Sequence, residues 1–246
     1  MASEADPRRG EGEQSEGGVN QFFAYFGGKS SLSRYYPAPE HDTIVEPFAG
    51  AAGYETRYPR RKVVLVEKDE RVATLWRYLI RVSAREILKL PDLAVGAKVS
   101  DLNVTPEAKL LIGYNVQFSA SGGPRNSLTT WSAGSDSMWG PVLRARIAGQ
   151  VEKIRHWRII EGDYSLAPDV DATWYVDPPY EKMGAYYRCS AKAIDFKKLG
   201  AWCRSRRGQV MVCENEGATW LPFRPFVARA PSSNKASSAE VIWTNA

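Results

Sequence analysis

Short apolar runs alternate with longer amphipathic stretches along the chain. Four runs of mainly apolar residues predict buried strands, at residues 43–45, 63–66, 173–176 and 210–213, and two further short runs predict strands at residues 158–160 and 241–243. After the second run, the apolar residues from Val72 to Ile80 keep helical spacing, and Asp69 stands where a helix cap is expected. Strands that alternate with helices predict an α/β fold, in which a sheet carries helices on both of its faces.

The pattern changes between residues 83 and 140. Residues 87–88 and 110–112 predict short helices, whereas residues 113–140 are irregular and rich in Gly, Ser, Asn, Thr and aromatic residues. A long irregular segment within a domain is typical of a functional loop, although a merely mobile surface loop is the alternative. The segment contains side-chain amides and a guanidinium that could contact base edges and phosphates of a nucleic acid. They belong to Asn115, Gln117, Arg125 and Asn126.

Two further stretches complete the domain plan. Pro141 is expected to open a helix whose apolar face continues as far as Ile154. The first residues are acidic, glycine-rich and nearly free of large apolar side chains, which predicts a disordered tail. The expected organisation is a tail at residues 1–18, a main domain at residues 19–82 and 141–246, and an insertion at residues 83–140.

Length and composition are those of a globular protein with a substantial core. The chain has 246 residues, 43% of them hydrophobic, which fits one domain with an insertion. The net charge is +5, and the acids concentrated in residues 1–18 leave the remainder more basic still. A basic body favours a polyanionic partner, although a modest positive charge is also common in other soluble proteins.

Cysteine and histidine contents narrow the chemistry. The three cysteines, Cys189, Cys203 and Cys213, have neither an even count nor metal-ligand spacing, so we expect reduced thiols and no disulfide or metal site. With only two histidines, His41 and His156, catalysis by a histidine base is not expected. No apolar run is long enough to span a membrane and no signal-like segment opens the chain, so the expected location is the cytoplasm.

The tetrapeptide Asp177-Pro178-Pro179-Tyr180 directly follows the predicted strand at residues 173–176. Ligands bind at the carboxyl ends of strands in open α/β sheets. Two prolines fix the backbone and remove two donors, which leaves carbonyl acceptors beside the Asp177 carboxylate and the flat face of Tyr180. These groups suit the exocyclic amine of a nucleic-acid base, because the acceptors take its two hydrogens while the ring stacks on the base. A plain strand-to-turn junction is the alternative.

Two glycine-containing turns lie earlier in the chain. Residues 25–29, Tyr-Phe-Gly-Gly-Lys, let the backbone approach a ligand closely and place Lys29 within reach of an acceptor. Residues 46–53 have the layout of a nucleotide-type cofactor turn but lack a phosphate-gripping lysine, so an adenosine without phosphates would fit. Glu67 ends the next strand about 20 residues after the turn and is placed to accept from ribose hydroxyls.

Later residues add a further acid and a basic run. Asp163 follows the predicted strand at residues 158–160 and could accept from the amino group of an adenine, or simply cap a turn. Basic side chains then accumulate, and we expect them to form a phosphate track beside the site. They are Arg188, Lys192, Lys197, Lys198, Arg204, Arg206 and Arg207, with the aromatic residues Tyr186 and Tyr187 before them.

In this order the motifs resemble those of the Dam-like DNA adenine-N6 methyltransferases over most of residues 22–246. Residues 25–29 look like the family's aromatic-x-Gly-Gly-Lys motif, residues 46–50 like its S-adenosylmethionine loop, and residues 177–180 like its catalytic motif. The family often has aspartate where this chain has Glu67. The resemblance implies a Rossmann-like methyltransferase sheet with helices on both faces and an inserted target-recognition region.

The resemblance also implies roles for the matching residues. The implied catalytic residues are Asp177, Pro178, Pro179 and Tyr180. The implied contacts to S-adenosyl-L-methionine are Tyr25, Gly27, Gly28, Lys29, Glu46, Pro47, Phe48, Gly50, Glu67, Asp163, Tyr164 and Asp177. The expected DNA contacts are Asn115, Gln117, Arg125, Asn126, Tyr186, Tyr187 and Arg188.

The implied reaction transfers a methyl group from S-adenosylmethionine to N6 of an adenine that is flipped out of double-stranded DNA. The scheme needs no metal, no membrane and no covalent enzyme intermediate, and a monomer in a bacterial or phage-infected cell is the working expectation. Two relatives of this reaction stay open, the methylation of cytosine N4 and the methylation of adenine in RNA. A non-catalytic nucleic-acid-binding protein that keeps the fold is the alternative of another class.

Overall fold

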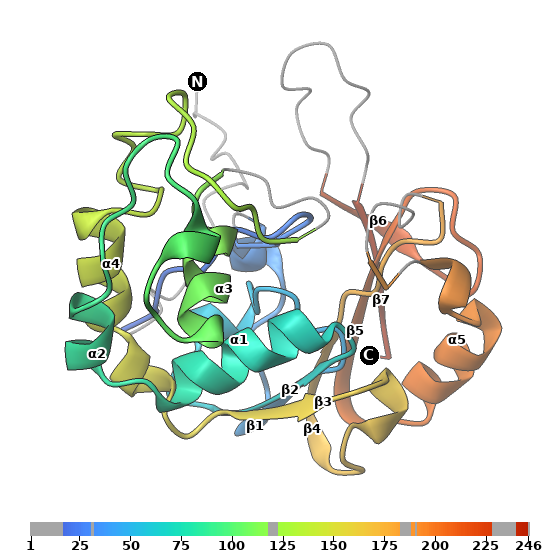
Figure 1. Ribbon diagram of the computed structural model, residues 1–246. Coiled ribbons are helices and arrows are strands. Elements are labelled where there is room, and N and C mark those ends of the chain that lie inside the picture. The colour runs from blue at the N-terminus through green and yellow to red at the C-terminus, as the bar shows by residue number, and fades with distance from the viewer. Residues whose placement is uncertain are drawn as a thin grey trace, which may run out of the picture.

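The computed structural model describes residues 17–30, 32–117, 123–182, 188–189, 191–227 and 240–245, so most of the predicted tail lies outside the described residues. Within them, seven strands form one sheet (Figure 1). The strands are β1 (Thr43–Glu46), β2 (Lys62–Glu67), β3 (Arg158–Glu161), β4 (Asp171–Val176), β5 (Arg207–Asn215), β6 (Arg224–Val227) and β7 (Glu240–Thr244). Their order across the sheet is β3-β2-β1-β4-β5-β7-β6.

The centre of the sheet is parallel and contains a reversal of strand order. β1 pairs with β2 on one side, where Val45 is opposite Val64, and with β4 on the other, where Val45 is opposite Trp174. Because the chain order reverses between β1 and β4, their carboxyl ends border the crevice in which open α/β sheets bind ligands. β7 runs antiparallel between β5 and β6. The predicted α/β class is confirmed, and the mostly parallel mixed sheet is compatible with a Rossmann-like fold.

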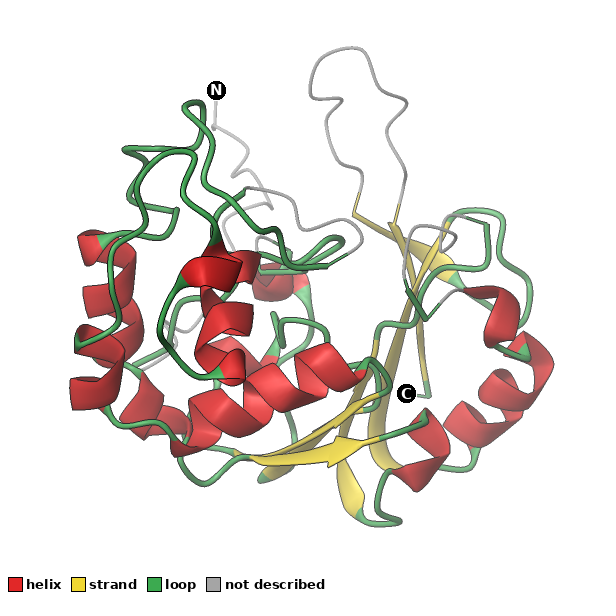
Figure 2. Ribbon diagram, in the orientation of Figure 1, coloured by secondary structure: helices red, strands yellow, loops and turns green. Residues whose placement is uncertain are grey.

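Five α-helices lie among the described residues (Figure 2). They are α1 (Glu70–Arg81), α2 (Ala84–Leu88), α3 (Pro106–Tyr114), α4 (Pro141–Ala148) and α5 (Phe196–Arg204). Short-range signals start them: the Asp69 side chain accepts a backbone N–H at the start of α1, as predicted, and Asp195 does the same for α5. At α2, Ser83 and Glu86 form a capping box.

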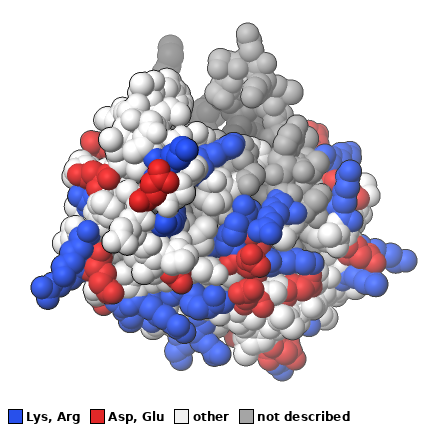
Figure 3. All heavy atoms as spheres, viewed as in Figure 1, with Lys and Arg blue, Asp and Glu red and all other residues white. Residues whose placement is uncertain are grey.

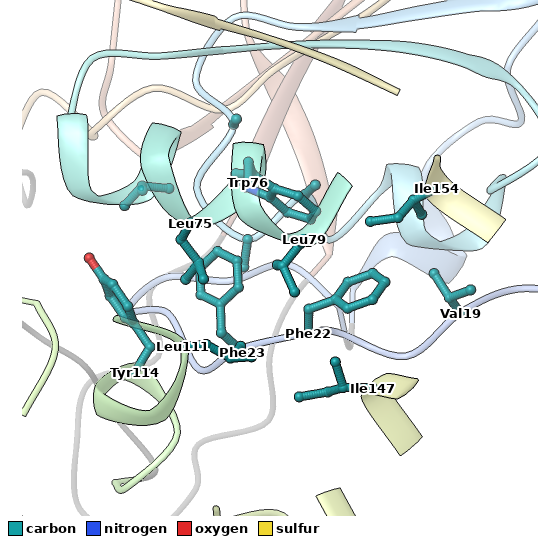
Figure 4. Packing of buried hydrophobic residues seen from close by; sticks show 14 of the residues in the cluster. Val19, Phe22, Phe23, Leu75, Trp76, Leu79, Leu111, Tyr114, Ile147 and Ile154 are labelled. Carbon is teal, nitrogen blue, oxygen red and sulfur yellow. The ribbon is translucent and has the colours of Figure 1, made fainter. Parts of the chain in front are cut away.

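Side chains of each strand alternate between two hydrophobic layers. Ile44 belongs to the cluster that contains α1, whereas the next residue, Val45, belongs to the cluster that contains α5. In the first layer, Trp76 of α1 packs against the rings of Phe22 and Phe23, with centroids 5.9 and 5.5 Å away (Figure 4). Burying a side chain of this kind contributes about 1.5–3 kcal/mol. The segment before β1 is therefore fastened to α1.

The described part of residues 83–140 shares this core. Leu111 and Tyr114 of α3 belong to the same cluster as α1 (Figure 4). Trp139 is also buried, and its ring N–H donates to the carbonyl of Pro91 over 3.0 Å. The predicted insertion is thus packed onto the main domain, and its apolar residues extend the same hydrophobic layer.

Three elements depart from the expectation. The helix that opens at Pro141 ends at Ala148, and Val151–Ile154 forms a separate 3-10 turn. The basic stretch contains α5, whose apolar residues bury one face of that helix. β6 is an edge strand that contains Pro225, and because proline counts against a strand in the sequence pattern, β6 was not predicted.

Candidate functional site

A cavity of about 500 Å³ lies where β1, β2 and β4 end. This volume is within the range of small-molecule sites. The cavity brings together every residue expected to contact the cofactor, although they come from separate stretches of the chain. Its wall contains Tyr25, Gly27, Gly28, Lys29, Glu46, Pro47, Phe48, Gly50, Glu67, Asp163, Tyr164 and Asp177. Of the remaining residues of the tetrapeptide, Pro179 also lines the cavity, Pro178 is buried and Tyr180 is half-buried.

Lys29 is the centre of a charged network at this edge of the sheet. Its ammonium donates to both carboxylate oxygens of Asp177, at 2.8 and 3.0 Å, and to the hydroxyl of Tyr180. A second carboxylate, on Glu240 at the start of β7, lies 3.9 Å away. Burial acts to lower the pKa of Lys29, but the two carboxylates outweigh burial and raise that pKa. Lys29 therefore stays charged and fixes the direction of the Asp177 carboxylate.

Tyr180 is held by the same network. The Lys29 ammonium lies 4.5 Å from the centre of the Tyr180 ring, and the ring packs against the first hydrophobic layer. Burial raises the pKa of the Tyr180 hydroxyl and the Asp177 charge raises it further, so the phenol stays neutral. The tetrapeptide is thus anchored through both its first and its last side chain.

The turn after β1 approaches the cavity with its backbone. Gly50 has a φ of 44°, and a Cβ there would lie 3.0 Å from the ring of Tyr25. Gly53 packs as closely, because a Cβ there would lie 2.8 Å from the backbone nitrogen of Ser30. Trp76 of α1 donates its ring N–H to the carbonyl of Gly50 over 2.8 Å. The two glycine-containing turns therefore pack directly on each other, and α1 holds the second in place.

Glu67 is buried at the end of β2 and organises the backbone around it. One of its carboxylate oxygens accepts from the amide of Gly50 at 3.0 Å, and the other accepts from the amide of Asp69 at 2.7 Å. Burial raises the pKa of Glu67, and these backbone hydrogen bonds oppose the shift. Each oxygen keeps a second lone pair, so Glu67 can position the turn and still accept from a ligand hydroxyl.

Two aromatic rings form another part of the wall. Phe48 and Tyr164 stack with centroids 5.6 Å apart. Next to them, Asp163 accepts from the amide of Ser165 at 3.2 Å and pairs with Lys68 at 3.2 Å. Burial acts to raise the pKa of Asp163, but the bonds from Ser165 and Lys68 outweigh it, and the pKa is lowered. Asp163 therefore caps a turn, one of the two roles considered for it, and its carboxylate remains available at the cavity wall.

The residues expected to contact DNA have unlike environments. Asn115 is 2% exposed, and its amide donates to the carbonyls of Phe22 and Leu111. Its placement in the core does not support the expected base contact. Arg125 and Asn126 are exposed. The side-chain carbonyl oxygen of Asn126 accepts from the backbone amide of Ser100 at 2.8 Å. Of the others, Gln117 is partly exposed, whereas Tyr186 and Tyr187 lie outside the described residues.

The basic run does not form a single track. Arg188 is exposed and lines the cavity, 3.4 Å from the Asp69 carboxylate. Arg207, in contrast, is the register partner of Asp171 at the amino ends of β5 and β4. The cavity lies at the carboxyl ends of the parallel strands, so Arg207 is at the far end from it. Arg206 lies 4.7 Å from the ring centre of Trp202. The expectation of one phosphate track is wrong for this end of the run, because α5 carries the chain across the sheet. Figure 3 likewise shows basic residues interspersed with acidic ones over the visible face.

Two acids of this region are not singled out by the sequence patterns. Glu240 is 7% exposed and accepts a hydrogen bond from the hydroxyl of Tyr36. Glu55 is fully buried in the 3-10 turn Glu55–Arg57, which follows the glycine-containing turn. A charged residue inside or directly beside an apolar stretch is the signal that could have identified both.

Among the described residues, no group of three or more His, Cys, Asp and Glu side chains is arranged to hold a metal ion. No described helix is both long enough and apolar enough to cross a membrane. A search with models of known protein families finds no match to the chain, and a search of curated proteins finds none either.

Proposed function

We propose that the chain is an S-adenosylmethionine-dependent DNA methyltransferase of the Dam-like type, which acts on N6 of adenine. One observation carries the proposal. The carboxylate of Asp177, locked by two hydrogen bonds from Lys29, lies at the switch point of the sheet and lines the same cavity as the turn after β1. A fixed acceptor and a small-molecule pocket thus meet in one place.

The cavity wall fits an adenosyl cofactor in its chemistry. Glu67 offers acceptor lone pairs for ribose hydroxyls, and the rings of Phe48 and Tyr164 offer an apolar face for a base. Gly50 lets the backbone come close without a side chain. When bound, S-adenosylmethionine supplies an electrophilic methyl group on a positively charged sulfur.

The tetrapeptide would act on the second substrate. An exocyclic amine is a poor nucleophile because its lone pair is delocalised into the ring. Acceptors on the Asp177 carboxylate and the Pro178 carbonyl would take its two hydrogens and direct the lone pair, and Tyr180 would hold the ring. Positioning of this kind supplies much of the acceleration in a direct transfer. The role of Lys29 is then to stop the carboxylate from rotating.

The proposal is tested by comparing wild type with Asp177→Asn on unmethylated duplex DNA and labelled cofactor. Wild type should transfer label to DNA, whereas Asp177→Asn, which keeps the shape but loses the charge held by Lys29, should transfer it at least about 100-fold more slowly. Cofactor affinity, measured calorimetrically, should be largely retained. Equal rates for the two proteins would contradict the assigned role of Asp177.

The same acceptors would also suit other planar amines. Cytosine in DNA and adenine in RNA are the substrates to include in that comparison, and nucleoside analysis of the product separates them. Cofactor binding without transfer to any of them would favour a non-catalytic nucleic-acid-binding protein.

A further inference from the structure

Glu46 and Glu55 form a buried pair of carboxyl groups at the cavity. Glu46 is the last residue of β1, is 3% exposed and lines the cavity, whereas Glu55 has no exposed surface. The Oε2 atom of Glu46 and both oxygens of Glu55 are buried, and no other donor side chain of the described residues reaches them; the nearby backbone donor is the amide of Glu55 itself. The two carboxyl groups are instead within hydrogen-bonding distance of each other.

Such a contact requires a proton between the two groups. An ionised carboxylate can only accept, so a hydrogen bond between two carboxyl groups exists only if one of them is protonated. Burial raises the pKa of Glu46 and of Glu55, and their mutual interaction makes them titrate as one system. With both groups ionised, the pair would hold two buried and uncompensated charges at short distance, which is strongly unfavourable.

The surroundings of the pair strengthen this conclusion. Glu67 at the end of β2 and Asp177 after β4 both add negative charge that disfavours a second ionisation of Glu46. Asp177 acts on Glu55 in the same direction. Of the cations that line the cavity, Lys29 is paired with Asp177, Lys68 with Asp163 and Arg188 with Asp69. Arg57, on the same 3-10 turn as Glu55, lies over the ring of Tyr58.

We infer that Glu46 and Glu55 share one proton, and that the pair recognises a cationic group of the cavity's ligand by giving up this proton when the ligand binds. In this arrangement Glu46 faces the ligand, and Glu55 is a positioning residue that sets the charge presented by Glu46. The inference rests on the proposed function, because S-adenosylmethionine carries two such cations, a sulfonium and an ammonium group. A neutral ligand of the same shape would leave the proton in place.

Calorimetric binding in two buffers of different ionisation enthalpy measures the protons released. Wild type should release up to one proton per S-adenosylmethionine bound at neutral pH. Glu55→Gln should release almost none, because its amide donates to Glu46 and keeps that carboxylate ionised in the free protein. Glu46→Gln should bind the cofactor about 10-fold more weakly or worse, since a hydrogen bond to a charged group is lost.

Two analogues identify the cation. S-adenosylhomocysteine keeps the ammonium group but has a neutral sulfur, and methylthioadenosine lacks both charges. Proton release with S-adenosylhomocysteine assigns the pair to the ammonium group, whereas release with S-adenosylmethionine alone assigns it to the sulfonium. Release of as many protons with methylthioadenosine would overturn the inference.

A second measurement requires no ligand. The infrared band of a protonated carboxyl group should be present in wild type at neutral pH and weakened in Glu55→Gln and in Glu46→Gln. Glu214→Gln is the matched control, because Glu214 is also buried but lies outside the cavity wall and accepts from Trp220 and two backbone amides. This variant should keep the proton release of wild type.

The outcomes separate the two claims. If wild type does not bind S-adenosylmethionine, the proposed function fails. If it binds the cofactor without releasing protons, or if Glu55→Gln releases as many protons as wild type, the proposed function stands and the shared proton is disproved. Thermal melting of each variant confirms that it is folded before binding is compared.

Discussion

Replacement of Lys29 by methionine removes the cation from the network around Asp177 at nearly constant side-chain volume. The side chains of Lys29 and Asp177 are 10% and 16% exposed, and their closest atoms are 2.8 Å apart. Breaking a buried pair by removing one partner costs about 3–5 kcal/mol, because the remaining charge is left uncompensated. Since Asp177 keeps some contact with solvent, we expect a loss near the lower end, about 3 kcal/mol.

Urea unfolding, followed by tryptophan fluorescence, measures this loss directly. A loss of about 3 kcal/mol corresponds to a decrease in melting temperature of about 6–12 °C for a chain of this size. The raised pKa of Lys29 sets the pH of the experiment. The interaction of the Lys29 ammonium stabilises the folded protein fully below pH 10.5, the pKa of lysine in the unfolded chain. The stabilisation is lost only as pH rises through the higher pKa of Lys29 in the folded protein, so all of it is present at neutral pH.

The double variant Lys29→Met with Asp177→Asn is the internal control. Removing both charges leaves no uncompensated carboxylate at position 177, so the double variant should be more stable than the sum of the two single losses implies. Additive losses, or a loss below about 0.5 kcal/mol for Lys29→Met, would refute the idea that this ion pair holds the site together.

Three further predictions follow from the described geometry. Gly50→Ala should lower stability by at least about 2 kcal/mol, because it adds a steric clash to a positive φ. Gly96→Ala, with a φ of 80° and open space around it, should lower stability by only about 1 kcal/mol. Equal losses in urea unfolding would disprove the clash. Arg188→Ala should weaken duplex DNA binding and reduce its salt slope by about 1, while Arg206→Ala should leave both unchanged, as measured by salt titration of binding. Because the pKa of Glu55 is raised in the folded state, its carboxyl group stabilises the protein at low pH, and this stabilisation is lost as pH rises above about 4.5. Glu55→Gln should therefore make the free energy of unfolding fall less steeply with pH. An unchanged dependence of stability on pH would contradict the raised pKa of Glu55.

The strands and the main site residues could be predicted because the information is local. A short apolar and aromatic run such as residues 174–176 is expected to be buried, and the residue that follows it lies at the strand's end. Once the sheet is parallel, residues at the ends of β1, β2 and β4 meet at one edge. Lys29 reaches the same edge from the segment before β1, 148 positions before Asp177, and its place at the site was expected from the resemblance of residues 25–29 to a known motif.

The environments of Asn115, Arg206 and Glu55 could not be predicted from the sequence, because they depend on contacts between distant segments. Asn115 has the composition of a recognition residue, but the packing of α3 against the segment before β1 takes its amide into the core. Arg206 belongs to a continuous basic run in sequence, yet α5 leads it to the opposite edge from Arg188. Glu55 acquires its chemistry from a neighbour nine positions away that no helical or strand spacing brings near it.

The identity of the methylated nucleoside tests the proposed methyl transfer to adenine. Unmethylated duplex DNA is incubated with the protein and labelled S-adenosylmethionine, digested to nucleosides and separated by chromatography. We expect the label in N6-methyladenine, and we expect it to be lost in the Asp177→Asn variant. Label in another nucleoside would move the reaction to a different base, and no label in any nucleic acid, with the cofactor bound, would contradict the assignment of a methyltransferase.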